Sequence, residues 1–115
     1  MPHRTLVTKE LAELLGALSH PHRIRIVEEL RSGERNVNAL REALGISHSG
    51  VSQHLMVMRA NRLVSERREG RQVFYHLRQL ELATCLLDAT GFLEKETVDA
   101  NELRKAISKT RKDWA

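Results

Sequence analysis

Hydrophobic residues recur at helical spacing along most of the chain, and capping residues divide this pattern into short helices. Thr8 stands at the expected N-cap of a first helix, whose apolar stripe is Leu11, Leu14, Leu15 and Leu18. Proline suits the first turn of a helix, so His20-Pro21 begins a second helix, which ends at Ser32-Gly33. The residues expected to point inward from it are Ile24, Val27 and Leu30.

Two further short helices are separated by only three residues. Asn36 is expected to cap the first of them, and Gly45 to end it. Ser47 then caps the second, whose inward face is expected to carry Val51, Leu55, Met58 and Arg62, the last with its stem along apolar surface. Two short helices joined by a three-residue turn that contains glycine predict a helix-turn-helix.

The opposite face of the helix that begins at Ser47 lacks acidic residues and is polar at its N-terminal end. It carries Ser49, Gln53, Met56 and Ala60, with Ser52 beside them. A helix that reads the major groove of DNA needs such small or hydrogen-bonding side chains, and a glutamine there can pair with adenine. His48 and the backbone amides after Ser47 are placed to meet a phosphate.

Strand spacing replaces helical spacing between Val64 and Leu77. Glu69-Gly70 predicts a two-residue turn of a β hairpin. Three arginines surround this turn, which suggests contacts to a neighbouring minor groove or its phosphates: Arg67, Arg68 and Arg71. A solvated hairpin tip is the alternative interpretation.

Helical spacing returns from Leu80 to Lys95, and Asp99 and Glu102 resemble a capping box that opens a last amphipathic helix. We therefore expect a domain over residues 1–97, with residues 98–115 as a helix packed on it. The first and fifth helices are richer in leucine than their own core requires, which favours a homodimer interface over packing within one chain. The interface is expected to contain Leu11, Leu14, Leu15, Leu18, Leu82, Leu86, Ala89 and Leu93.

Composition narrows this interpretation. The 115 residues suffice for one hydrophobic core, and 19 Lys and Arg against 15 Asp and Glu give a formal charge of +4, which is compatible with a polyanionic partner. No apolar run is long enough to cross a membrane, so we expect a cytoplasmic protein without a membrane partner. The single cysteine, Cys85, excludes an internal disulfide and is expected to be buried beside the leucine stripe.

Four segments together resemble the arsenic-repressor (ArsR/SmtB) family, and the resemblance covers roughly Leu11 to Leu93. They are Leu18–Ile26 (LSHPHRIRI), Leu44–Ser47 (LGIS), Val51–Leu55 (VSQHL) and Glu69–Tyr75 (EGRQVFY). The resemblance implies a homodimeric winged-helix repressor whose first and fifth helices form the dimer interface. It also implies that the fourth helix reads DNA and that an inducer lowers the affinity for the operator.

Neither usual metal site of that family carries over to this chain. Where the family has a Cys-Val-Cys thiolate pattern, this sequence has Asn36-Val37-Asn38, and amides do not supply the sulfur that soft metals select. At the four ligand positions of the fifth helix it has Gln79, Glu81, Phe92 and Lys95. We therefore expect no metal, no cofactor and an unknown inducer.

We expect the histidines at the start of the second helix and in the fourth helix to have structural roles. A metal site built from His20 and His22, with His3 nearby, is an open alternative, but no local carboxylate or cysteine completes it. We interpret His20 as a helix-start residue and His22 as a surface residue. His54 is expected to orient the recognition helix, with a phosphate contact as its second role.

The sequence thus predicts a mainly α, α+β winged helix-turn-helix with about five core helices, a two-stranded β wing and an extra C-terminal helix. The predicted function is sequence-specific binding of double-stranded DNA, as a homodimeric repressor on an inverted-repeat operator. The predicted DNA-binding residues are Ser47, His48, Ser49, Ser52, Gln53, His54, Arg67, Arg68 and Arg71. A metal- or redox-responsive sensor with a non-standard site and a winged-helix protein-interaction module remain alternatives. No nucleophile–base pair, glycine-rich phosphate loop or motif of paired carboxylates indicates an enzyme.

Overall fold

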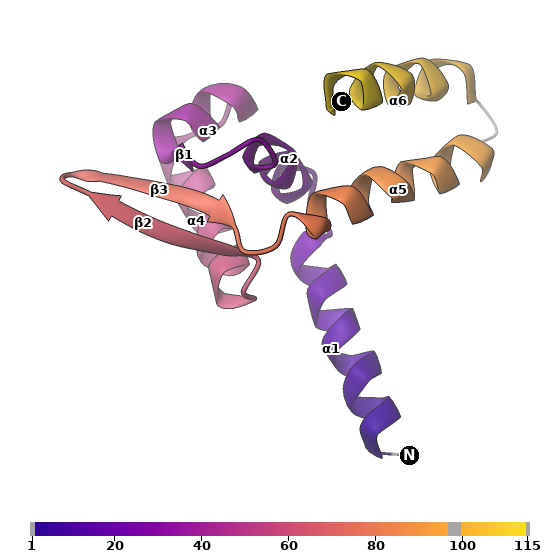
Figure 1. Ribbon diagram of the computed structural model, residues 1–115, viewed down its shortest axis with the longest axis horizontal. Coiled ribbons are helices and arrows are strands. Elements are labelled where there is room, and N and C mark those ends of the chain that lie inside the picture. The colour runs from indigo at the N-terminus through magenta and orange to yellow at the C-terminus, as the bar shows by residue number, and fades with distance from the viewer. Residues whose placement is uncertain (1, 97–99, 115) are drawn as a thin grey trace. The chain divides into compact units, whose positions relative to one another are not determined.

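The computed structural model describes residues 2–96 and 100–114, which form six helices and three strands (Figure 1). In chain order these are α1 (Pro2–Leu18), α2 (Pro21–Leu30), β1 (Arg35–Asn36), α3 (Val37–Leu44), α4 (His48–Ala60), β2 (Val64–Glu69), β3 (Gln72–Leu77), α5 (Glu81–Glu96) and α6 (Ala100–Trp114). The chain divides into two compact units, Met1–Leu80 and Glu81–Ala115. The domain boundary expected after residue 97 and the cap expected at Asp99 lie outside the described residues.

The core of the first unit is aliphatic and centres on α2, α3 and α4. On α4, Val51, Leu55 and Met58 are buried as predicted, whereas Arg62, expected on the same face, is exposed beyond the end of the helix. The prediction for α2 was wrong at Ile24, which is 43% exposed, whereas Ile26 is fully buried. The buried face of α2 is formed by Ile26, Val27 and Leu30, and Ile24 lies to one side of it.

The helix-turn-helix forms from the predicted caps. The side-chain oxygen of Asn36 accepts a hydrogen bond from the backbone N–H of Ala39 (2.8 Å), which starts α3. Gly45 ends α3 in the left-handed conformation (φ 68°), which glycine adopts without steric cost. The Ser47 hydroxyl then accepts from the backbone N–H of Gly50 (3.1 Å) and starts α4.

The wing is part of a three-stranded antiparallel sheet in the order β1-β3-β2, rather than the two-stranded hairpin predicted (Figure 1). The additional strand, β1, consists of two residues and pairs with β3. Glu69 pairs with Gln72, so the turn residues are Gly70 and Arg71, one position later than predicted. Gly70 supplies the positive φ (61°) that this turn requires.

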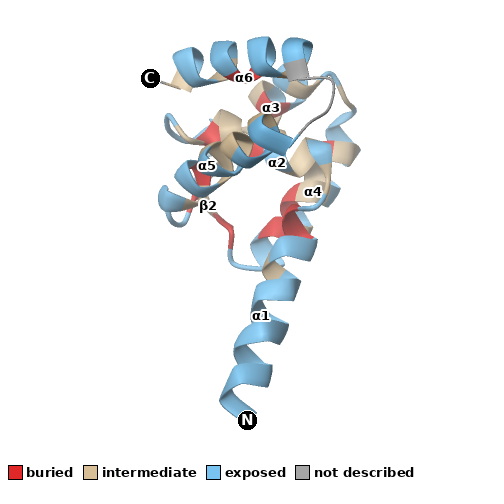
Figure 2. Cartoon of the chain, turned by 90° about the vertical axis from the view of Figure 1, so that its right-hand side faces the viewer, coloured by how far each residue is buried: buried red, intermediate tan, exposed pale blue. Residues whose placement is uncertain are grey.

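The first helix begins earlier than predicted and is exposed along most of its length (Figure 2). Thr8 is not its N-cap, because α1 already starts at Pro2 and the Thr8 hydroxyl donates to the carbonyl of Arg4 (2.9 Å) inside the helix. Only the C-terminal end of α1 enters the core, through Ala17 and Leu18. The rest of the helix exposes a set of large apolar side chains: Leu6, Val7, Leu11 and Leu15.

The second unit consists of α5 and α6. An ion pair joins them, with an Arg111 guanidinium nitrogen 3.2 Å from a Glu94 carboxylate oxygen. The expectation of a buried Cys85 was wrong, since this residue is exposed on α5. Among the described residues, no helix is both long and apolar enough to span a membrane.

Candidate nucleic-acid interface

The outward face of α4 presents the polar side chains that the sequence predicted there. Ser49 and Gln53 are exposed, while Ser52 is half-buried at the edge of this face. The hydroxyl oxygens of Ser47 and Ser49 lie 3.3 Å apart at the start of the helix. Further along the same side, Met56 is 67% exposed, so an apolar group follows the polar ones.

A recess of about 370 Å³ joins the start of α4 to the wing. It is lined by Asn36, Val37, Asn38, His48, Ser52, Arg71, Gln72, Val73 and Tyr75. Two predicted DNA-binding residues of α4, His48 and Ser52, therefore meet Arg71 from the wing turn at one hollow. Since the N-terminus of a helix attracts anions, the hollow combines a helix end with a cationic side chain.

The three wing arginines differ in their surroundings. The Nε of Arg67 donates to both carboxylate oxygens of Glu34 (3.1 Å each), and its NH1 donates to Glu69 (2.9 Å). This bonding lowers the pKa of the Glu34 carboxyl and raises the pKa of Arg67. Arg67 also stacks over the Phe74 ring, 5.0 Å from its centroid. Arg67 thus fastens the wing to the segment before β1.

Arg68 and Arg71 are more open to a partner. The Arg68 side chain is 75% exposed, and its nearest carboxylate oxygen, on Glu66, is 3.9 Å away. Arg71 is exposed at the turn itself. Two of the three predicted arginines are therefore exposed cations, whereas the charge of Arg67 is largely offset by two carboxylates.

The base of the wing is tied to the C-terminal end of α4 by residues that the sequence analysis did not single out. An Arg59 guanidinium nitrogen lies 3.1 Å from a carboxylate oxygen of Glu66. The Tyr75 hydroxyl donates to that carboxylate (3.3 Å), and burial together with the Glu66 charge raises the pKa of Tyr75. These contacts orient β2 and β3 relative to α4.

His54 lies on the inner side of the interface, among residues from the start of α2. Its Nδ1 accepts a hydrogen bond from the Nε of Arg23 (3.2 Å). Burial lowers the pKa of His54, and the positive charges of His20, Arg23 and His22 lower it further. His54 is half-buried, a position that suits the predicted role of orienting α4, which stays a prediction.

The two neighbouring histidines lie at the N-terminus of α2. His20 is its N-cap as predicted, with Nδ1 accepting from the backbone N–H of His22 (3.1 Å). His22 is half-buried rather than on the surface as expected. Within residues 2–96 and 100–114, His20, His22 and His54 are the one group whose geometry suits a metal ion, so the expectation of no metal ligands is not confirmed.

The family's usual metal positions have other surroundings. The Asn36 side chain caps α3 with its oxygen and donates its amide to the Gln72 side chain (3.3 Å). On α5, Phe92 is 68% exposed and Glu81 and Lys95 are also exposed. At these positions Asn36 therefore has a structural role, whereas Glu81, Phe92 and Lys95 face solvent.

Comparisons with known proteins agree with the fold and identify the family. Residues 20–66 match the model of a family described as "Bacterial regulatory protein, arsR family". The chain is 41% identical over 86 residues to the HTH-type transcriptional repressor SmtB of Mycobacterium tuberculosis, covering 75% of this chain and 64% of that protein. It is 33% identical over 99 residues to the nodulation protein NolR of Rhizobium meliloti, covering 86% of this chain and 80% of NolR.

A solved structure gives the same result for the fold. The homodimeric winged helix-turn-helix DNA-binding domain of a possible ArsR-family regulator from Mycobacterium bovis superposes with a TM-score of 0.73 at 26% identity. The superposition covers 84% of this chain and 94% of that domain. The predicted winged helix-turn-helix is thereby confirmed.

Proposed function

Because the chain belongs to the arsR family of bacterial regulatory proteins, we propose that it is a homodimeric transcriptional repressor that binds an inverted-repeat operator through α4 and the wing. The observation that carries this proposal is the exposed face of α4, which lacks acidic residues and presents Ser49 and Gln53 beside the hollow lined by Arg71. Family membership also agrees with the expectation of a regulator rather than an enzyme. We expect the protein to act in the cytoplasm, beside the DNA that it regulates.

Base recognition is assigned to the first turns of α4. Gln53 is exposed and is long enough to form a bidentate contact to adenine in the major groove. Ser49 and Ser52 are short, so they allow close approach of the helix to the base edges. Met56 adds an exposed apolar group on the same side, suited to a thymine methyl.

Phosphate contacts are assigned to the start of α4 and to the wing. The first turn of α4 offers backbone N–H groups, and His48 and Arg71 line the hollow next to it. Arg68 supplies a second exposed charge on the wing. Contacts of this kind fix the register of a protein on DNA without reading its sequence.

The repressor is proposed to be a homodimer because α1 exposes a row of apolar side chains that its own unit does not cover. Leu11 is 53% and Leu15 is 63% exposed, and Val7, one turn before Leu11 on the same side of the helix, extends the row. A twofold interface that joins two copies of this face removes that surface from water. Leu18 is buried within its own chain, so the exposed leucines of α1 carry this part of the proposal.

On α5 the predicted interface residues fall into two pairs. Leu82 and Leu86 are half-buried, while Ala89 and Leu93 are exposed. These exposures suit a helix that contributes apolar area to a second copy of the chain.

A protein-interaction module is the weaker candidate. Hot spots of protein interfaces are enriched in aromatic and arginine side chains. The outward face of α4 has no aromatic residue in its sequence, whereas it has the serine and glutamine side chains that read base edges.

The experiment that tests the proposed function is selection from a pool of random DNA duplexes, followed by footprinting of the enriched site. We expect an inverted repeat whose half-sites are spaced by about one helical turn (about 10 bp) or a small multiple of it. Failure to enrich any sequence, or enrichment of a site without twofold symmetry, would contradict the proposal.

A further inference from the structure

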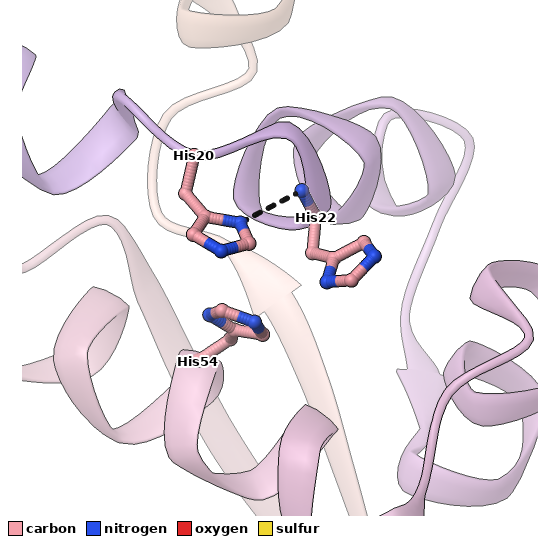
Figure 3. A group of neighbouring side chains, drawn as sticks. All are labelled: His20, His22 and His54. Atoms are coloured by element: carbon pink, nitrogen blue, oxygen red, sulfur yellow. Dashed lines mark hydrogen bonds between the residues drawn. The ribbon is translucent and has the colours of Figure 1, made fainter.

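Three imidazoles from two separate helices converge at the junction of α2 and α4 (Figure 3). His20 and His22 come from the start of α2 and His54 from the middle of α4. One nitrogen of each lies within 4.8 Å of the others, and the ring centroids are 4.4 to 5.5 Å apart. All three side chains are half-buried, so solvent reaches the group while the fold limits its movement.

From this arrangement we infer that His20, His22 and His54 form a binding site for a divalent transition metal ion of the zinc type. Three neutral imidazoles with a fourth position open to water are an established coordination for zinc, and imidazole also suits cobalt, nickel and copper. Zinc–nitrogen bonds of about 2.0–2.1 Å bring the nitrogens of a tetrahedral site to about 3.3 Å from one another. Side-chain rotations that move these nitrogens by roughly an ångström would bring them to the separation of a tetrahedral site.

The site differs from both metal positions that the family resemblance implies. It uses no residue of the Asn36-Val37-Asn38 stretch and none of Gln79, Glu81, Phe92 and Lys95. It also contains no carboxylate or thiolate among the described residues, so the metal ion would retain its full positive charge. Such a site favours borderline metals with nitrogen ligands over calcium or magnesium, which prefer oxygen.

Metal binding would compete with two hydrogen bonds of the structure. The Nδ1 of His20 accepts from the backbone N–H of His22, and the Nδ1 of His54 accepts from Arg23. An imidazole that accepts a hydrogen bond at Nδ1 carries its proton at Nε2, so a metal ion either displaces the donor or requires the other tautomer. The ion therefore exchanges the side-chain cap of α2 for a direct link between α2 and α4.

Because the ligands are far apart in the sequence, metal binding at this site is coupled to folding. His54 is 32 positions beyond His22, so the three imidazoles meet only in the folded chain. An ion that binds only the folded chain stabilises it, and above the dissociation constant this stabilisation grows with the logarithm of the ion concentration. The inference rests on this geometry alone and stands or falls independently of the proposed DNA-binding function.

The test is titration of the purified, untagged protein with Zn²⁺ by calorimetry, and with Co²⁺ by visible absorption. We expect one ion per chain and a Co²⁺ spectrum typical of tetrahedral nitrogen ligands. His22→Gln and His54→Gln should each weaken Zn²⁺ binding by roughly tenfold or more. His20→Asn should do the same while keeping a side chain that can cap α2.

A matched control is His76→Gln, which removes a histidine of β3 outside the group and should bind Zn²⁺ like the parent protein. Wild-type binding in His54→Gln, or absence of binding in the parent protein, would overturn the inference.

A second measurement does not depend on the folding of any variant. Zn²⁺ added to the unmodified protein should shift the imidazole ¹⁵N resonances of His20, His22 and His54 and leave those of His48 and His76 in place. Shifts confined to histidines outside the group would overturn the inference.

Discussion

Gln53 is the residue on which sequence recognition depends in this account. Truncation to alanine removes its amide but leaves the helix surface in place, because the side chain is exposed. We expect Gln53→Ala to cost about 1–3 kcal/mol on the selected operator and to relax the preference at one base pair. Competition binding with operator variants measures both effects. Gln79→Ala, which removes an exposed glutamine outside α4, is the matched control, and an equal loss on every sequence for Gln53→Ala would refute its assignment as a base reader.

Glu34 and Arg67 provide a pH-dependent prediction. Arg67 lowers the pKa of Glu34 in the folded chain, so the folded state holds the ionised carboxylate more firmly than the unfolded state does. The stabilisation is therefore present above the unfolded pKa of about 4.3 and is lost as the pH falls through the lower folded value. Glu34→Gln should unfold at a lower temperature than the parent protein at pH 7, and the difference should shrink as the pH falls below the unfolded pKa and through the lower folded pKa of Glu34. A difference that persists in acid would show that the ion pair is not its source.

At the scale of single residues, the sequence predicted side-chain orientation better than side-chain partners. The helical period correctly placed Gln53 outward and Val51 inward. It did not predict that Arg67 bonds Glu34 or that His54 meets His20, because these partners are more than thirty positions apart. Such pairs depend on how the elements pack, and a periodic pattern contains no information about that.

Asn36 links two elements, because it caps α3 and also bonds β3 through Gln72. Loss of a helix N-cap costs about 1 kcal/mol, so Asn36→Ala should destabilise the protein by about that amount in denaturant unfolding. Asn36→Asp keeps an oxygen that can cap α3 and should retain most of the stability. If the aspartate variant is as unstable as the alanine variant, the cap is not the cause.

The elements themselves were largely predictable where capping residues and periodicity agreed. Asn36, Gly45 and Ser47 gave the helix-turn-helix its bounds, and the structure confirms them. The two-residue strand β1 was not predictable, because so short a strand exists only through its pairing with β3. Thr8 misled the prediction of where α1 starts, because a threonine hydroxyl bonds to a carbonyl four residues earlier within a helix as readily as it caps one.

At the scale of the whole molecule, the exposed apolar face of α1 is proposed to join two copies of the chain. Leu11 is exposed within one chain, so Leu11→Glu should leave the fold intact and place charge in the proposed interface. We expect this variant to be monomeric by light scattering and to bind the operator much more weakly than the parent protein.

Lys9→Glu is the matched control, since residue 9 lies on the opposite side of α1 from Leu11. It should remain dimeric. If the Leu11→Glu variant is still dimeric, the assignment of α1 to the dimer interface is wrong.

At this scale the sequence predicted the fold class through its capping residues, its hairpin and a family resemblance, and it predicted the dimer through a surplus of leucine. It could not separate leucines that serve the chain's own core from those left for a partner. The structure makes that distinction on α1, where Leu18 is buried and Leu15 is exposed. Periodicity places both on the same stripe, because only the end of the helix packs against the rest of its unit.

The most direct test of the central claim is the salt dependence of binding to the selected operator. If α4 and the wing contact DNA phosphates, affinity should fall steeply and linearly in a plot of log affinity against log salt concentration. Arg71→Ala should weaken binding to all sequences nearly equally and reduce that slope by about 1 for each protomer, whereas Lys9→Ala on α1 should leave it unchanged. Absence of binding to duplex DNA in dilute buffer, or a slope that Arg71→Ala does not alter, would contradict the account.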